Sequence, residues 1–266
     1  MSPVMNIATR TLRQALEFLQ QSIERQDFQF EDADNLRNRI SVIEQNMHKI
    51  ILQNLKRAYN DHYVAALGET HLSDKEVAWQ LIPIHQPINL VRGLPGNAVS
   101  LTCFHRGKPE HAVIFNPSTG EEYTASRGRG ATLNGRRIRA SSVNSIDAAL
   151  IGSNVLETGR KKSNGHVYLD LYTDLSSTKL PIYTSGCSLM DLAYVSAGKL
   201  DGAVLFDTDM NSLAPGILMA QESGALYGDF SGNTAGNDSK SIVCANPKLF
   251  KTILQKLYTY RTRLQP

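Results

Sequence analysis

The chain has 266 residues, and its 28 Lys and Arg against 25 Asp and Glu leave a formal net charge of only +3. A chain of this length forms one large domain or two small ones, with a core that needs no disulfide staples. The composition excludes a collagen, a disulfide-dense small protein and a disordered tail. The small net charge also argues against a protein that binds nucleic acid through bulk charge.

The cysteines and the N-terminus indicate a cellular location. Cys103, Cys187 and Cys244 are odd in number, lie far apart and match no CxxC or zinc-binding spacing. We expect reduced thiols that fill the core. Arg10 and Arg13 stand where a signal peptide would be apolar, and no apolar run is long enough to span a membrane. The sequence therefore predicts a cytoplasmic protein without membrane contact.

The first part of the chain has the apolar spacing of helices. Residues 12–23 and 36–55 each carry a stripe in which apolar side chains recur every three or four positions. The stripes consist of Leu12, Leu16, Leu19 and Ile23, then Leu36, Ile40, Ile43, Met47, Ile51 and Leu55. This spacing predicts two long amphipathic helices, separated by a polar break at residues 31–34. We expect both helices to pack on a sheet.

From Trp79 onward the pattern changes to strands and turns. Short β-type runs occupy residues 99–104, 113–115 and 122–125. Asn134-Gly135 is the strongest hairpin signal in the chain, because both residues tolerate the left-handed backbone that a tight hairpin turn requires. This region therefore predicts a meander of antiparallel strands.

The second half alternates between helix and strand patterns. The predicted strands are residues 149–153, 203–206, 225–227 and 241–244, and the predicted helices are residues 167–175, 189–197 and 215–222 and a last one from Pro247. Such alternation is typical of a layered α/β region. No repeat or low-complexity linker separates residues 1–146 from 147–266, so we expect a single domain over residues 1–266.

Four segments carry a resemblance to a known family. Residues 94–100, 124–139, 190–202 and 214–232 resemble the inositol monophosphatase family of Mg²⁺-dependent, lithium-sensitive phosphomonoesterases. The resemblance covers nearly the whole chain. It implies the layered αβαβα sandwich of that superfamily, an α/β fold, and a homodimer.

The N-terminus resembles one bacterial branch of this family. The matching residues are Pro3, Asn6, Ile7, Ala8, Arg10 and Arg13, and the branch is known as SuhB. The resemblance implies partners in the transcription machinery, NusA and RNA polymerase, and a role in ribosomal RNA antitermination. This inference of partners rests on analogy alone.

The main metal motif of the family, Asp-Pro-Ile/Leu-Asp-Gly-Thr, falls on residues 82–87 but is degenerate. Ile82 and His85 stand at the two Asp positions, and Gln86-Pro87 replaces Gly-Thr. An alkyl group offers no lone pair, and imidazole is a poor Mg²⁺ ligand because hard cations bind oxygen. Pro87 has neither an N–H for a phosphate nor a hydroxyl for a water.

The remaining site positions also depart from the family. The second-motif Asp falls on Ser212, and a Glu-Glu pair falls on Leu67-Gly68, one residue before Glu69. A helix Asp falls on Ile43, and a sugar-contacting Glu falls on Leu205. Burying a divalent cation without these carboxylates is unfavourable. We therefore expect no Mg²⁺, no other cofactor and no intact catalytic residue, in a cavity of aliphatic and hydroxyl groups.

Several residues of this region have two interpretations. His85 could bind a softer metal with Asp207 or Asp209, but we favour a loop histidine that fills the cavity, because a metal needs a set of ligands. Asp207 and Asp209 are better explained as turn or N-cap acids, and Glu69 stays a weak metal candidate.

The family's substrate pocket suggests further roles. We expect Leu205, Gly186 and Cys187 to line its vestige, with Cys187 as a core filler or, alternatively, a reactive thiol. Asp191 is expected to have a structural role.

Five arginines crowd the predicted hairpin: Arg127, Arg129, Arg136, Arg137 and Arg139. They could form a patch for RNA or for an acidic protein. We favour a solvated turn, because no aromatic residues are interleaved to stack on bases.

Three functions remain open at this point. The first is a non-catalytic regulatory or scaffold protein of the SuhB type. The second is a Mg²⁺-dependent inositol-1-monophosphatase with a rearranged cluster of Glu69, Glu76, Asp207 or Asp209. The third is a binding module that keeps the pocket for a phosphorylated or apolar small ligand.

Overall fold

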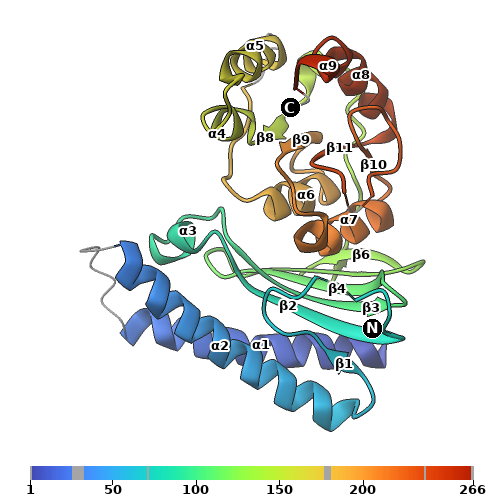
Figure 1. Cartoon of the computed structure of the whole chain (residues 1–266). Helices are drawn as coiled ribbons and strands as arrows, with labels where there is room; N and C mark the ends of the chain where they lie inside the picture. Colours follow the sequence, from blue (N-terminus) through green and yellow to red (C-terminus); the bar gives the residue numbers. More distant parts are fainter. Residues whose placement is uncertain (1, 26–32, 71, 177–180, 237, 265–266) are drawn as a thin grey trace.

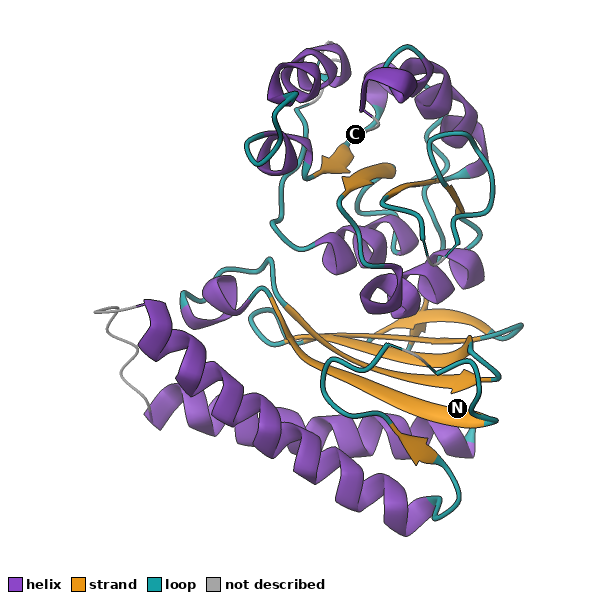
Figure 2. Cartoon of the chain, in the orientation of Figure 1, coloured by secondary structure: helices purple, strands orange, loops and turns teal. Residues whose placement is uncertain are grey.

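The computed structural model describes residues 2–25, 33–70, 72–176, 181–236 and 238–264. Two long helices, a seven-stranded sheet, a middle helix layer, a four-stranded sheet and an outer helix layer follow one another (Figures 1 and 2). The αβαβα sandwich that the resemblance implies is therefore confirmed.

The two predicted N-terminal helices are α1 (Pro3–Arg25) and α2 (Ala33–Ala58). Their apolar stripes lie against each other and against one face of the first sheet, where Leu12, Met47 and Trp79 are fully buried. Residues 31 and 32 of the predicted polar break lie outside the described residues. Local periodicity was sufficient to find these helices because each buries a single continuous face.

The first sheet contains its strands in chain order. They are β1 (Tyr63–Val64), β2 (Val77–His85), β3 (Ala98–His105), β4 (Lys108–Asn116), β5 (Glu121–Ser126), β6 (Gly130–Leu133) and β7 (Arg136–Arg137). All pairs are antiparallel except β1 with β2. Asn134 and Gly135 have φ angles of 49° and 76°, as a two-residue hairpin turn requires. The predicted meander and hairpin are confirmed.

The short helix α3 (Pro87–Val91) follows β2, and the second half then begins with the 3₁₀ turn η1 (Ile146–Ala148). Its other elements are β8 (Ile151–Ser153), α4 (Val155–Gly159), α5 (Gly165–Leu175), α6 (Ser188–Ser196), β9 (Gly202–Phe206), α7 (Met210–Ser223), β10 (Leu226–Gly228), β11 (Ser241–Ala245), α8 (Pro247–Tyr258) and α9 (Arg261–Leu264). The sheet order is β10-β11-β9-β8, and β8 runs parallel to β9.

Helix α7 begins five residues earlier than the sequence predicts. We expected a start at Pro215, but the helix starts at Met210 and Pro215 lies inside it. The Asp209 side chain caps the helix by accepting a hydrogen bond from the Asn211 backbone N–H at 3.1 Å. Pro215 removes only the bond to the Asn211 carbonyl, near the helix start, and burial of its neighbours outweighs that loss.

Helices α6 and α7 form the layer between the two sheets (Figure 1). Their buried side chains touch Ile114 and Tyr123 of the first sheet on one side and Leu205 and Ile242 of the second sheet on the other. This layer therefore joins the two halves through one continuous apolar cluster. Within the described ranges, no helix combines the length and apolar character that crossing a membrane requires.

Candidate functional site

The family motifs converge on a cavity of about 310 Å³ where the two halves meet. Strand β2 contributes His85 at its end, α6 contributes Cys187 at its N-cap, and α7 contributes Ser212 in its first turn. Further lining residues are Gln86, Asn154, Glu157, Lys161, Asp207 and Asp209. We call this the His85 cavity. Most of these side chains are polar, so the expected lining of aliphatic and hydroxyl groups was wrong.

Parallel strands bring the distant parts of the cavity together. Because β8 and β9 run parallel, the residues that follow them, Asn154 and Asp207, lie at the same edge of the sheet. The Asn154 side-chain amide donates to the Phe206 carbonyl at 2.9 Å, and its oxygen accepts from the Phe206 N–H at 2.8 Å. Asn154, Glu157 and Lys161 were missed from the sequence, where only their position after a predicted strand could have indicated them.

His85 is the last residue of β2 rather than a loop residue, which corrects the expectation. Its Nε2 atom lies 3.1 Å from Ser100 Oγ on the neighbouring strand. Burial lowers the pKa of His85 to about 4, and the Asp209 charge opposes this shift only in part. The imidazole is therefore neutral near pH 7.

Gln86 and Pro87 shape the backbone beside His85. Gln86 has φ 59° and ψ 68°, a left-handed conformation that costs a non-glycine residue about 1–2 kcal/mol. It is the N-cap of α3 but makes no side-chain capping hydrogen bond. Pro87 occupies the first turn, where a missing N–H is tolerated. Pro87 therefore has no backbone N–H to donate to a phosphate at this turn.

Each carboxylate in the His85 cavity already has a partner within the chain. Asp207 lies 2.9 Å from Lys162 Nζ, and Glu157 lies 3.3 Å from Lys161 Nζ. Asp209 caps α7, as the N-cap interpretation predicts. The Ser212 hydroxyl donates to the Asp209 backbone carbonyl at 2.8 Å. In the described part of the chain, no three His, Cys, Asp or Glu side chains are grouped as metal ligands.

The donor set does not fit Mg²⁺, which needs several carboxylate or carbonyl oxygens aimed at one point. His85 would present a nitrogen, and the three carboxylates are engaged elsewhere. The side chains of the His85 cavity therefore do not fit a Mg²⁺-dependent step.

The rearranged acidic cluster considered from the sequence is not assembled. Both carboxylate oxygens of Glu69 accept the Tyr63 hydroxyl at 2.9 Å, and one also accepts the Ala66 N–H. Glu76 lies 3.9 Å from Arg106 Nη2, and both side chains are more than 70% exposed, at 76% and 74%. Neither glutamate lines the His85 cavity. Both glutamate side chains therefore make their contacts in loops at strand ends, outside the His85 cavity.

Two residues expected in the pocket do not line it. Leu205 is fully buried and packs toward α6 and α7, because alternate side chains of β9 point to opposite faces. Its neighbour Phe206 reaches the cavity in its place. Ile82 is half-buried in β2, opposite Ser100 and before an irregularity in the strand pairing. It is absent from the cavity lining.

Gly186 and Cys187 line the cavity where α6 begins. Gly186 has a φ angle of 77°, and the Ser185 hydroxyl accepts the Cys187 N–H at 2.9 Å. Burial raises the pKa of Cys187 to about 12, so its sulfur is a thiol near neutral pH. This favours the core-filler interpretation over a reactive nucleophile.

Two of the five hairpin arginines contact nearby backbone, one on β4 and one within the hairpin. The Arg127 guanidinium donates to the Pro109 carbonyl from Nε at 3.1 Å, and the Arg137 guanidinium lies over Gly130. All five arginine side chains are exposed. The hairpin therefore has the character of a solvated, partly self-contacting turn.

Comparison with known proteins identifies the family. The sequence model of the inositol monophosphatase family matches residues 1–262. Nus factor SuhB of Pseudomonas aeruginosa is 34% identical over 262 residues, or 96% of this chain and 95% of that protein. Nus factor SuhB of Escherichia coli K12 is 28% identical over 262 residues, or 97% and 96%.

A solved structure agrees with these sequence matches. The crystal structure of extragenic suppressor protein SuhB from Bartonella henselae has a TM-score of 0.79 at 25% identity, covering 97% of this chain and 100% of that chain. The chain therefore belongs to the inositol monophosphatase family.

Proposed function

We propose that this member of the inositol monophosphatase family does not hydrolyse phosphate esters and acts as a regulatory protein of the SuhB type. Its partners would be NusA and RNA polymerase, in ribosomal RNA antitermination. The observation that carries the first part is the donor set of the His85 cavity. The SuhB names of the relatives support the second part.

The charges around the cavity oppose phosphate binding without a metal. Glu157, Asp207 and Asp209 contribute three carboxylates, whereas Lys161 is the one Lys or Arg among the described residues that line the cavity, and Lys162 reaches Asp207 from beside it. Two like charges about 4 Å apart repel by about 4 kcal/mol at an effective dielectric constant near that of a protein surface. A phosphate dianion would therefore need a metal to shield it from these carboxylates. The carboxylates of Asp207, Glu157 and Asp209 instead contact Lys162, Lys161 and the backbone at the start of α7.

The catalytic part is tested by titrating the protein with Mg²⁺ in a calorimeter and by assaying phosphate release from inositol 1-phosphate. An active family member is assayed in parallel as the positive control. We expect no saturable Mg²⁺ binding and no turnover. Mg²⁺-dependent release of phosphate that lithium inhibits would refute this part of the proposal and restore the phosphatase alternative.

The partner part is tested separately with purified NusA and RNA polymerase. We expect the tagged chain to retain NusA, and to retain the polymerase when NusA is present. A homodimer, which the family resemblance implies, would appear as a single species of twice the chain mass in sedimentation equilibrium. Retention of neither protein above the level of an unrelated tagged control would remove this assignment, whatever the outcome of the phosphatase assay.

A further inference from the structure

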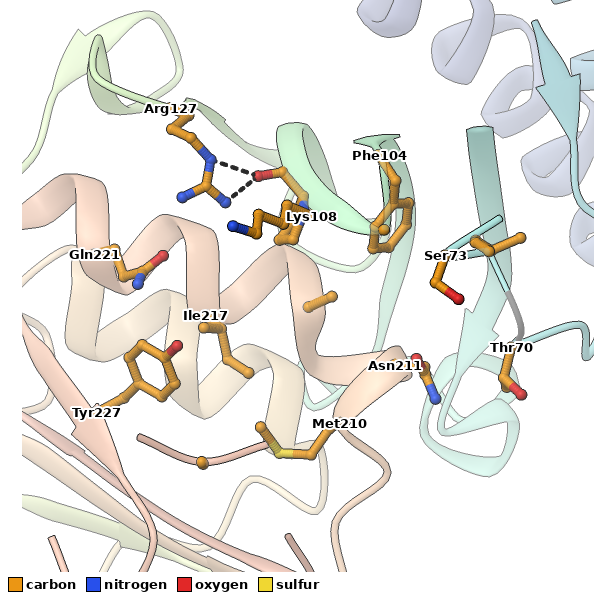
Figure 3. A pocket seen from close by; sticks show the side chains of 15 residues that line it. Thr70, Ser73, Phe104, Lys108, Arg127, Met210, Asn211, Ile217, Gln221 and Tyr227 are labelled. Atoms are coloured by element: carbon orange, nitrogen blue, oxygen red, sulfur yellow. Dashed lines mark hydrogen bonds between the residues drawn. The ribbon is translucent and has the colours of Figure 1, made fainter. Parts of the chain in front are cut away.

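A second cavity, of about 360 Å³, lies on the other side of the start of α7 (Figure 3). Its walls come from α7, from the β3–β4 turn, from Arg127 after β5, from the loop between β1 and β2, and from β10 and the loop after it. We call it the Lys108 cavity. Ser212 and Leu213 of α7 face the His85 cavity, whereas Met210 and Ala214 face this one, so the two cavities are distinct.

The floor of the Lys108 cavity is apolar. Met210, Ala214 and Ile217 form one face of α7, because they recur every three or four residues, and Phe104 lies opposite them. Each of these side chains is at most 8% exposed. The apolar floor runs from Met210 to Ile217, seven residues that span about 10 Å along the helix axis, and the polar Gln221 follows one turn later. The floor thus accommodates an elongated apolar group of about that length.

One end of the cavity is cationic. Figure 3 shows Lys108 and Arg127 beside Gln221 at this end, while Thr70, Ser73 and Asn211 lie at the other. Among the described residues, no Asp or Glu lines the cavity. Burial raises the pKa of Tyr227, and the nearby Arg127 charge lowers it, so the phenol and the guanidinium share this space.

The two cations differ in how far they are neutralised. Arg127 Nε lies 3.3 Å from Glu110 Oε2 and also donates to the Pro109 carbonyl, so the guanidinium is held in place and its charge is offset. Lys108 makes no ion pair with any described residue. The cavity end therefore carries about one uncompensated positive charge, which suits a monoanion better than a dianion.

We propose that the Lys108 cavity binds a small organic carboxylate with an elongated apolar body. The carboxylate lies between Lys108 and Arg127, where charge-assisted hydrogen bonds are strong. The apolar body lies along Met210, Ala214 and Ile217, where its burial supplies most of the affinity. A phosphate ester is a poorer occupant because its second negative charge has no cation to neutralise it.

The test uses octanoate as the probe, with octanamide and inorganic phosphate as matched controls, in calorimetric titrations of the full chain. We expect octanoate to bind at one site, octanamide to bind about tenfold more weakly because it lacks the charge, and phosphate not to bind. The Lys108→Met variant is expected to lose about tenfold in octanoate affinity. Lys108→Arg is expected to retain it, and Lys49→Met, an exposed lysine on α2, to leave it unchanged.

Circular dichroism verifies that each variant is folded. Because Lys108 is exposed at the start of β4, its replacement leaves the core intact. A second variant, Ala214→Phe, fills the apolar floor and is expected to abolish octanoate binding while Lys108 remains. Equal affinity for octanoate and octanamide, no octanoate binding, or unchanged affinity in Lys108→Met would each overturn the proposal.

Discussion

The Nζ atom of Lys162 lies 2.9 Å from the Oδ1 atom of Asp207, a carboxylate that lines the His85 cavity. Asp207 has a φ angle of 48° directly after β9, so the left-handed turn directs it toward this edge of the sheet. The Asp207 carboxylate also raises the pKa of Lys162, which keeps the ammonium charged. A lysine of the chain thus offsets the charge of this carboxylate at the edge of the cavity.

Removing that lysine should expose the carboxylate to added cations. In Lys162→Met we expect Mg²⁺ to raise the thermal midpoint weakly and in a salt-sensitive way, because Asp207 loses its partner. The parent and the exposed-lysine control Lys251→Met should not respond. The ion pair itself is half-exposed and screened by solvent, so the variant should lose little unfolding free energy. An identical Mg²⁺ response in parent and variant would contradict this view of the pair.

The neutral state of His85 should make stability depend on pH. Its pKa falls from 6.5 to about 4 on folding, so the unfolded chain binds the proton more tightly. The contribution of neutral His85 to the free energy of unfolding is therefore complete above about pH 6.5. It is lost as the pH falls toward 4, by at most about 3 kcal/mol.

The measurement is urea unfolding from pH 7.5 to 4.5 for the parent and for His85→Gln. Gln retains a polar partner for Ser100 and does not titrate. We expect a smaller loss of stability in the variant over this range. Parallel pH profiles for the two proteins would show that His85 does not carry the effect.

Asp191 should have the opposite pH dependence. It lies in the first turn of α6, is 2% exposed, and its Oδ1 atom is buried without a hydrogen-bond partner among the described residues. Burial raises its pKa to about 7, so the folded chain binds the proton more tightly and stability falls as pH rises from about 4 to 7.

Asp191→Asn should therefore stabilise the protein most at alkaline pH. We expect a gain of about 2–4 kcal/mol in unfolding free energy at pH 8 and less than half of that at pH 5. Urea unfolding at both pH values measures it, with Asp201→Asn as a control because Asp201 Oδ2 accepts the Leu150 N–H. A gain that is equal at both pH values would assign the effect to packing instead of charge.

The three cysteines should be unreactive in the folded state. Cys103, Cys187 and Cys244 are at most 4% exposed, and burial raises the pKa of each to about 12. Because the thiolate is the nucleophile, native protein at pH 8 should take up almost no iodoacetamide, and protein in urea should be labelled at all three. Mass spectrometry resolves the sites. Rapid labelling of Cys187 alone in native protein would revive its interpretation as a reactive thiol.

Sequence and structure agree best where the signal is local. The stripes of α1 and α2 and the Asn134-Gly135 turn were predicted because periodicity and backbone preference act within a few residues. The short elements β1, α3, α4 and α9 were not predicted, because they are too short for a period to show. The start of α7 was predicted five residues too far along the chain, because proline is favoured in the first turn of a helix. Burial of the middle helix layer outweighs that preference.

The sequence by itself determined the family, the order of the main elements and the presence of Ile82, His85 and Ser212, none of which carries a carboxylate, because those are properties of residue types in linear order. Only the tertiary structure decided what surrounds the cavity. Because side chains alternate along β9, Leu205 points into the core instead of the cavity. The parallel pairing of β8 with β9 brings Asn154 next to Asp207. Such contacts join residues about fifty positions apart, and no local pattern encodes them, because sheet pairing and layer packing set which side chains meet.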